Sequence, residues 1–371
     1  MIKVLQILTD TNIGGAGRLL INYLKNFDRS QFEMAVVLPK GAQLKPLVQA
    51  EGYPVIETET GRDKSFETAA VGELRRIIRE YQPDIVHCHS SFSGKLAAFL
   101  CRVPGRFYTR HCSFPQPKRL TTFPGKQING WINGILSTHI VAVSAAAEED
   151  LLVTGVKPKK ITVIMNGVEP MPASTAAEKA EIRRSLGIGA EDFVCGISAR
   201  LEVYKGHTYL LQAAALLKET HPSMKFLILG GGSEEAALRR EAENLGIADA
   251  VRFTGFVEQV APYLNIMDLN INCSIGTETA SLALSEGMSL GVPAVVSDFG
   301  GNPYMITDGV NGFVVPQKDP AALASVIRRI ADDPALHEQL SRGAREVYEQ
   351  RFTAAVMTRK MEELYRSAVK K

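Results

Sequence analysis

The chain has 371 residues, of which 45% are hydrophobic and 22% charged, the usual balance of a water-soluble globular protein. This length exceeds what one hydrophobic core usually serves, so two domains are expected. The formal net charge of +2 gives no sign of a nucleic-acid partner, and we expect none.

In the first half of the chain, short apolar runs alternate with helical patterns, which predicts a parallel sheet covered by helices. The run Ile-Val-Ala-Val at 140–143 is continuous rather than alternating, which indicates a strand covered on both faces. Helices are predicted over 16–27, 67–81 and 145–154. Strands are predicted over 3–9, 33–39, 53–57, 84–89, 106–111, 139–144 and 161–165.

The same alternation restarts after a segment at 166–180 that lacks periodicity and is interpreted as the hinge between domains. Strands are predicted over 193–198, 225–229, 251–254, 269–273, 294–297 and 313–315, and helices over 206–220, 234–245, 281–290 and 321–331. The predicted fold class is therefore α/β, with two Rossmann-like doubly wound parallel-sheet domains facing a central cleft. The predicted domains are 1–168 and 169–350, followed by a C-terminal helix at 351–371 that packs back on the first.

Cysteine usage and hydropathy indicate the compartment. The five cysteines show no paired spacing, which favours reduced thiols. The apolar run at the N-terminus is too short for a signal peptide, and no uncharged stretch is long enough to cross a bilayer. We therefore expect a cytoplasmic protein, with any membrane contact peripheral and on the inner face.

Two carboxylates eight positions apart stand out in the second half. Glu278 precedes the helix predicted from 281, and Glu286 lies roughly 9 Å further along the axis at 1.5 Å per residue. The unpaired N–H groups of the first helical turn form an anion site between them. A nucleotide sugar could place its diphosphate there, with one carboxylate on the ribose and the other on the sugar. In isolation the pair is equally compatible with two surface acids on a solvated helix.

This segment resembles the Glu-x7-Glu signature of the group 1 glycosyltransferases, a family that includes glycogen-synthase-like and lipopolysaccharide sugar transferases with the two-domain GT-B fold. Further phrases typical of that family occur in the expected order over nearly the whole chain, at 14–15, 83–89, 143–144, 164–169, 198–206, 291–301 and 308–313. Two departures concern the expected sugar pocket. Thr279-Ala280-Ser281 replaces the usual Gly-aromatic-Gly, and Pro303-Tyr304 replaces Pro-Glu.

The resemblance implies a retaining, metal-independent transfer of a hexose or N-acetylhexosamine from a nucleotide-diphosphate donor, for which UDP is favoured. Arg200 and Lys205 suit this reaction, because fixed cations stabilise the charge that develops on a leaving diphosphate. No cofactor and no metal are expected. Asp-x-Asp is absent from the sequence, and so is any paired Cys-x2-Cys spacing.

Donor-binding residues follow from the same resemblance. Gly14 and Gly15 open the first helix and would lie against the donor phosphates, although the loop lacks the third glycine of a dinucleotide fingerprint. Gly230 begins a Gly-Gly-Gly-Ser loop beside the nucleotide. The remaining donor contacts are expected from Phe256 and Val257 at the base, and from Ser281, Leu282 and Glu286.

His111 is predicted to end the strand 106–111 and, by resemblance, to touch the transferred sugar or its phosphate. The nearby His87, Cys88 and His89 do not favour zinc, because alternate strand positions send Cys88 to the opposite face. With Arg200, Lys205 and Glu278, His111 completes the predicted catalytic set.

Basic and aromatic residues alternate over 113–133, within a half that carries 21 basic against 15 acidic residues up to position 170, a net of +6. Lys118, Arg119, Lys126 and Trp131 could meet an anionic membrane or a phosphorylated acceptor. The alternative is an acceptor-domain loop whose aromatic side chains pack inward.

The predicted function is a retaining glycosyltransferase of bacterial-type polysaccharide or glycolipid assembly, acting on a glycan or lipid-linked acceptor. One alternative is a non-catalytic protein that binds nucleotide sugars. Another is a nucleotide-sugar epimerase or phosphorylase on the same fold, and a nicotinamide oxidoreductase is disfavoured by the incomplete glycine fingerprints.

Overall fold

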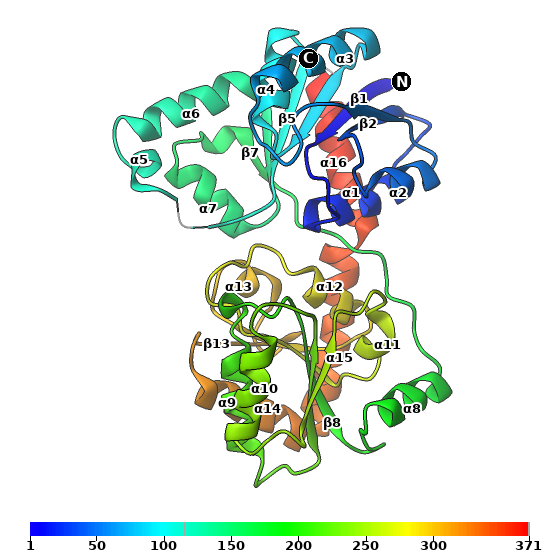
Figure 1. Ribbon diagram of the computed structural model, residues 1–371, viewed down its shortest axis with the longest axis vertical. Coiled ribbons are helices and arrows are strands. Elements are labelled where there is room, and N and C mark those ends of the chain that lie inside the picture. Colours follow the sequence, from blue (N-terminus) through cyan, green and yellow to red (C-terminus); the bar gives the residue numbers. More distant parts are fainter. Residues whose placement is uncertain (115, 370–371) are drawn as a thin grey trace. The chain divides into compact units, whose positions relative to one another are not determined.

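The computed structural model describes residues 1–114 and 116–369 (Figure 1). The chain divides into two compact units, one of Met1–Val168 together with the C-terminal segment from Ala354, and one of Glu169–Thr353. Each contains a parallel sheet flanked by helices, so the predicted α/β class with two Rossmann-like sheets is confirmed.

The first unit has a seven-stranded sheet in the order β3-β2-β1-β4-β5-β6-β7, with every neighbouring pair parallel. Its strands are β1 (Ile2–Leu8), β2 (Phe32–Pro39), β3 (Val55–Thr58), β4 (Ile85–His89), β5 (Gly105–Arg110), β6 (His139–Ala142) and β7 (Ile161–Val163). Its helices are α1 (Gly15–Lys25), α2 (Lys45–Ala50), α3 (Thr68–Tyr81), α4 (Phe92–Leu100), α5 (Lys118–Thr121), α6 (Gly125–Leu136), α7 (Ala145–Val153), the 3-10 turn η1 (Pro158–Lys160) and α16 (Ala354–Val369).

Both faces of this sheet are buried, as the continuous apolar runs predict. On one face α1 and the C-terminal helix α16 (Figure 1) pack against β1, β2 and β5. Tyr365 of α16 is fully buried there. On the other face α3 and α4 cover β1, β2 and β4, with Leu74 and Ile78 among the buried side chains. The C-terminal helix is therefore part of the first unit's core.

The second unit has a six-stranded parallel sheet in the order β10-β9-β8-β11-β12-β13. Its strands are β8 (Phe193–Ser198), β9 (Met224–Leu229), β10 (Val251–Gly255), β11 (Leu269–Asn272), β12 (Ala294–Ser297) and β13 (Gly312–Val315). Its helices are α8 (Ala176–Ser185), η2 (Val203–Lys205), α9 (His207–Leu217), α10 (Glu235–Asn244), α11 (Ala261–Leu264), α12 (Leu282–Ser289), α13 (Asn302–Met305), α14 (Pro320–Asp332), α15 (Pro334–Val347) and the π-helical turn η3 (Tyr348–Phe352).

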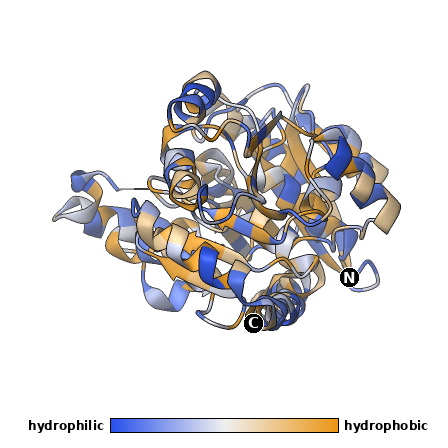
Figure 2. Ribbon diagram, turned by 90° about the horizontal axis from the view of Figure 1, so that it is seen from below, coloured by the Kyte–Doolittle hydropathy of each residue, from blue (hydrophilic) through white to orange (hydrophobic). Residues whose placement is uncertain are grey.

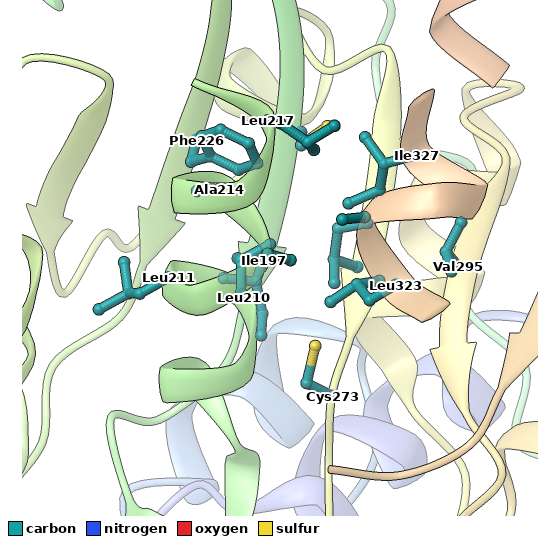
Figure 3. Close-up of a cluster of buried hydrophobic side chains, with 14 of the residues drawn as sticks. Ile197, Leu210, Leu211, Ala214, Leu217, Phe226, Cys273, Val295, Leu323 and Ile327 are labelled. Atoms are coloured by element: carbon teal, nitrogen blue, oxygen red, sulfur yellow. The ribbon is translucent and has the colours of Figure 1, made fainter. Parts of the chain in front are cut away.

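The core of this unit lies mainly between the sheet and α9 and α14. Leu210 and Leu217 of α9 face Leu323 and Ile327 of α14, and all four side chains are buried (Figure 3). A smaller cluster beneath α8 and α11 covers the opposite face. The hydropathy colouring shows largely apolar strands, whereas the helices carry both polar and apolar segments (Figure 2).

Three expectations about element boundaries are corrected. The irregular segment expected over 166–180 ends earlier, because Thr175 and Glu178 form a reciprocal capping box that starts α8 at Ala176. The chain returns to the first unit at Ala354 rather than near 351, because Phe352 is buried in the second unit. Strand β5 ends at Arg110, so His111 lies just beyond it.

The sheet orders locate the places where ligands bind. Strand order reverses between β1 and β4 in the first sheet and between β8 and β11 in the second. Ligands of such sheets bind beyond the carboxyl ends of the strands at these reversals. The loops after β8 and β11 contain Arg200, Lys205 and Glu278, so those residues lie at the reversal point of the second unit.

None of the helices in the described part of the chain has both the length and the apolar character needed to span a bilayer.

Candidate active site

The loops that follow β8 and β11 pack directly on one another. The amide of Ile275 donates to the carbonyl of Tyr204 at 2.8 Å. Gly206 has φ of +69°, and a Cβ there would meet the carbonyl oxygen of Cys273 at 2.1 Å. Only glycine accommodates both this left-handed conformation and this approach. The close packing brings Lys205 to the loop that contains Glu278.

Glu278 is buried at 7% exposure, and its side chain is held by three donors. Its Oε2 atom accepts from Lys205 Nζ at 2.9 Å, Asn272 Nδ2 at 3.0 Å and Ser274 Oγ at 2.9 Å. Hydrogen-bonded and ion-paired in this way, the carboxylate tolerates burial. Its second oxygen receives none of these three bonds, which leaves it as the atom that can face a substrate hydroxyl.

The backbone of Glu278 is fixed as tightly as its side chain. Its carbonyl accepts from the amide of Gly301 at 3.0 Å. Gly300 has φ of +58°, and a Cβ there would meet the same carbonyl at 2.1 Å. Gly300 and Gly301 therefore fix the backbone of Glu278 in place. They do so although Pro303-Tyr304 follows them where the family usually has Pro-Glu.

The side chains of Arg200 and Lys205 both lie near the ring of Tyr204. The guanidinium carbon of Arg200 and the Nζ of Lys205 each lie 5.9 Å from the ring centre of Tyr204. Arg200 is exposed, whereas Lys205 is partly buried by its ion pair with Glu278. The structure thus brings together three of the four predicted catalytic residues, with one cation available to solvent and one engaged.

Helix α12 begins where the sequence predicts it. Ser281 is the N-cap and accepts from the amide of Leu284 at 3.4 Å. The amides of Leu282 and Ala283 in the first turn have no partner within the helix, and the helix dipole adds positive potential there. Glu286 lies one turn further along and is part-buried. The start of α12 therefore lies between the two carboxylates, at the position where the sequence predicts an anion site.

Two further loops close this edge of the sheet. Gly230 donates to the carbonyl of Gly255 at 3.0 Å, which places the 230–232 loop beside Phe256 and Val257. Leu201, next to Arg200, donates to the carbonyl of Gly231 at 3.0 Å. Phe256 is 77% exposed, so its ring is available to stack on a flat ligand such as a base.

Sequence reasoning missed the residues that hold Glu278 in place. Asn272 and Ser274 were not singled out, although Asn272 is the last residue of the apolar strand β11 and Ser274 lies two residues beyond it. Polar side chains at that position are the signal that could have identified them.

In the first unit, Gly14 and Gly15 lie at the start of α1. Gly14 is the N-cap, both glycines are exposed, and no atom lies within 4 Å of where a Cβ would stand at either. This helix start is open to a ligand, as the predicted phosphate contact requires.

His111, which is part-buried, joins a hydrogen-bonded series of otherwise buried side chains in the first unit. His111 Nε2 and His89 Nδ1 lie 2.8 Å apart, and His89 Nε2 lies 2.8 Å from Gln6 Oε1. Gln6 in turn donates to the hydroxyl of Tyr365 at 3.0 Å, and that hydroxyl lies 2.5 Å from His87 Nδ1. The C-terminal helix is thereby tied to His111.

Burial keeps these imidazoles neutral at physiological pH. It lowers the pKa of His87 to about 3 and that of His111 to about 4, and it holds the pKa of His89 well below the ordinary value. His111 can therefore meet a sugar or phosphate as a neutral hydrogen-bonding group.

The segment with basic and aromatic residues is exposed. Phe123 is 81% and Trp131 68% exposed, on the loop before α6 and on α6 itself. Lys118 and Arg119 lie on α5 and Lys126 on the first turn of α6. The alternative in which the aromatic side chains pack inward is wrong, because α6 buries only Gly130 and Leu136.

Among residues 1–114 and 116–369, no group of three or more His, Cys, Asp and Glu side chains is arranged to hold a metal ion.

Comparison with known proteins decides the family. Two family profiles match, Glycosyltransferase Family 4 over residues 13–171 and Glycosyl transferases group 1 over residues 178–347. EpsD of Bacillus subtilis, which is named as a glycosyltransferase, is 30% identical over 313 residues, covering 80% of each chain. The chain belongs to the group 1 glycosyltransferase family.

Two more similarities span nearly the whole glycosyltransferase. The lipopolysaccharide core biosynthesis glycosyltransferase LpsD of Rhizobium meliloti is 27% identical over 96% of both chains. The crystal structure of HepE from Anabaena, in complex with UDP, superposes with a TM-score of 0.84 at 22% identity, covering 99% of this chain and 100% of that one. This likeness shows the GT-B fold, and each profile falls almost entirely within one of the two compact units.

Proposed function

We propose that this glycosyltransferase transfers a sugar from a UDP-linked donor to an acceptor hydroxyl with retention of anomeric configuration and without a metal ion. The observation that carries the proposal is the Glu278 cluster. A buried carboxylate and two cations lie in the loops after β8 and β11, at the reversal point of the second sheet, and α12 begins four residues after that carboxylate. The UDP named in the HepE structure supports the choice of nucleotide.

In this proposal the second unit binds the donor. The diphosphate lies on the amides of Leu282 and Ala283, Glu286 accepts from ribose hydroxyls, and Glu278 accepts from a hydroxyl of the sugar. Arg200 and Lys205 stabilise the charge that develops as the glycosidic bond breaks, in the role that a metal ion has in other transferases. Gly230 and the backbone near Phe256 and Val257 hold the nucleoside.

The transfer step needs no strong enzymatic base. The acceptor hydroxyl attacks the anomeric carbon from the face that the diphosphate leaves, so one carbon–oxygen bond breaks as another forms. The acceptor proton passes to an oxygen of the leaving phosphate. The protein then contributes orientation and electrostatic stabilisation, with the Gly14-Gly15 loop against the donor phosphates and neutral His111 at the transferred sugar or its phosphate.

For the acceptor we propose a glycan or lipid-linked intermediate of cell-surface polysaccharide assembly, in line with the name of the LpsD relative. The first unit would hold it. The exposed side chains of Phe123 and Trp131, together with Lys118, Arg119 and Lys126, form a basic and apolar surface suited to an anionic leaflet. Each basic residue near such a surface contributes about 1 kcal/mol of attraction.

The donor half of the proposal is tested with a panel of UDP-, GDP- and ADP-sugars, first by thermal stabilisation and then by hydrolysis and transfer. We expect a UDP-sugar to stabilise the protein most and to be hydrolysed slowly, and the new linkage to keep the donor's configuration by NMR. A nucleotide sugar that binds and is never consumed would favour a non-catalytic binding protein. Conversion to an epimer would favour an epimerase.

The membrane half is tested by vesicle co-sedimentation. We expect binding to anionic vesicles and not to neutral ones, lost in high salt and in a variant with Lys118, Arg119 and Lys126 replaced by Ala. Because screening is weakest at low salt, absence of binding to anionic vesicles there would reject membrane contact and favour a soluble acceptor.

A further inference from the structure

A second polar cavity lies within the first unit, at the carboxyl end of β5. It has a volume of about 230 Å³ and is lined by α4, β5, α6 and α7. One water needs roughly 10–15 Å³ of such volume, so the cavity has room for a phosphate with part of a sugar. One of its lining residues, Arg110, directly precedes His111 in the chain. The polar side chains that line it include Lys95, Tyr108, Arg110, Asn129, Asn133 and Asp150.

Lys95 projects from α4 and is 4% exposed. Its Nζ donates to Asn133 Oδ1 at 2.6 Å and lies 4.2 Å from the ring centre of Tyr108. No carboxylate among the described residues lies within ion-pair distance of it. Burial lowers the pKa of this ammonium to about 8, which is the expected result for a buried cation without a counter-charge.

Arg110, the last residue of β5, brings a second cation to the cavity. Its Nε donates to the carbonyl of Cys112 at 2.9 Å. Its Nη2 atom is buried without a hydrogen-bond partner among the described residues, and it lies 3.7 Å from the Asp150 carboxylate. That carboxylate already accepts from the amide of Phe114 at 3.0 Å and from Gln116 Nε2 at 3.3 Å.

The cavity therefore contains two cations and one carboxylate, with a buried guanidinium N–H left unsatisfied. A buried donor without a partner costs free energy, and so does a buried charge without a counter-ion. A bound oxyanion removes both costs, because guanidinium and ammonium groups donate strong charge-assisted hydrogen bonds to phosphate and carboxylate.

We propose that this cavity binds an oxyanion carried by the acceptor, a phosphate or a carboxylate, between Lys95 and Arg110. The assignment of this oxyanion to the acceptor rests on the proposed function, whereas the binding of an oxyanion in the cavity does not. The specificity would then be for acidic or phosphorylated glycans, with the acceptor anchored by its charged group near His111.

The test uses the full chain with saturating UDP, so that phosphate sites on the donor side are filled. Titration calorimetry is carried out with glucose 6-phosphate and glucuronate, and with neutral glucose as the control ligand. The variants are Lys95→Met and Arg110→Gln. The matched control is Arg79→Gln, an exposed arginine in the last turn of α3. Circular dichroism and UDP affinity verify that each variant is folded.

We expect at least one anion to bind, glucose to bind far more weakly, and each cavity variant to lose roughly ten-fold or more in affinity while Arg79→Gln does not. Binding of glucose 6-phosphate alone would identify phosphate as the source of the charge, and binding of glucuronate alone would identify a carboxylate. If Lys95→Met does not fold, Arg110→Gln decides.

The inference is overturned if neither anion binds, if glucose binds equally well, or if both folded variants bind as the unaltered chain does. Failure of the proposed function has a different signature. UDP would then not bind, and the anion titrations, repeated without UDP, would still distinguish the cavity variants from the control.

Discussion

Replacing Lys205 by Met would test whether the ion pair between Lys205 and Glu278 stabilises the folded second unit. The ion pair has an N–O distance of 2.9 Å, and its side chains are only 17% and 7% exposed. Removing one partner of a buried pair costs about 3–5 kcal/mol, because the other charge stays buried. Asn272 and Ser274 still donate to Glu278 in the variant. We therefore expect a loss near the lower end, about 3 kcal/mol of unfolding free energy.

A double-mutant cycle separates the pair from its surroundings. Glu278→Gln retains the shape of the side chain but removes its charge, and the double variant leaves neither charge buried. We expect the double variant to be more stable than the sum of the single effects predicts, by about 1–3 kcal/mol. Transfer activity should not recover, because both charges serve the reaction in the proposed mechanism.

Hydrogen exchange of β8 and β11, followed by mass spectrometry, is the suitable assay. It reports the opening of the second unit alone, whereas unfolding of the whole chain mixes two compact units. A coupling energy below about 0.5 kcal/mol would refute the reasoning, since independent sites add within that margin.

Three further predictions follow from the site. Glu286→Ala should weaken UDP binding in calorimetry while Glu278→Gln spares it, and equal losses would show that the two roles are wrongly assigned. Arg200→Ala should lower turnover by about two to three orders of magnitude, and activity should persist in excess chelator, so a strict need for magnesium or manganese would contradict the mechanism. Because the folded pKa values of His87 and His111, about 3 and about 4, lie below the ordinary 6.5, the unfolded chain binds protons first as pH falls. Stability of the first unit should be full above about pH 6.5 and fall by about 2 kcal/mol per histidine by pH 5, and equal protection of the β4 amides at pH 7 and 5, each measured relative to the intrinsic exchange rate at that pH, would contradict this.

The alternation of apolar runs and helical patterns was sufficient to predict the fold class. Strands over 193–198 and 294–297 agree with the structure residue for residue, because fully buried parallel strands are continuous apolar runs between polar turns. The start of α12 was predictable for a local reason as well, since Ser281 can cap its own helix.

Helix α8 was not predicted because its sequence lacks a stripe of apolar residues at helical spacing. It buries none of its ten residues, and its evidence in the sequence is the capping box of Thr175 and Glu178. A search for apolar periodicity therefore interpreted it as part of the hinge.

Only the tertiary structure decided the partners of the functional side chains. Glu278 meets Lys205, 73 positions away, because β8 and β11 are neighbours in the sheet although two strands separate them in the chain. Lys95 and Arg110 share a cavity because α4 packs beside β5. The sequence could not decide whether Trp131 is exposed either. An aromatic residue on a helix has the same local sequence pattern whether or not a neighbouring element covers it. Local sequence encodes strands, helices and caps through short-range sterics and hydrogen bonds, whereas contacts between distant residues depend on strand order, which is set by the packing of the whole domain.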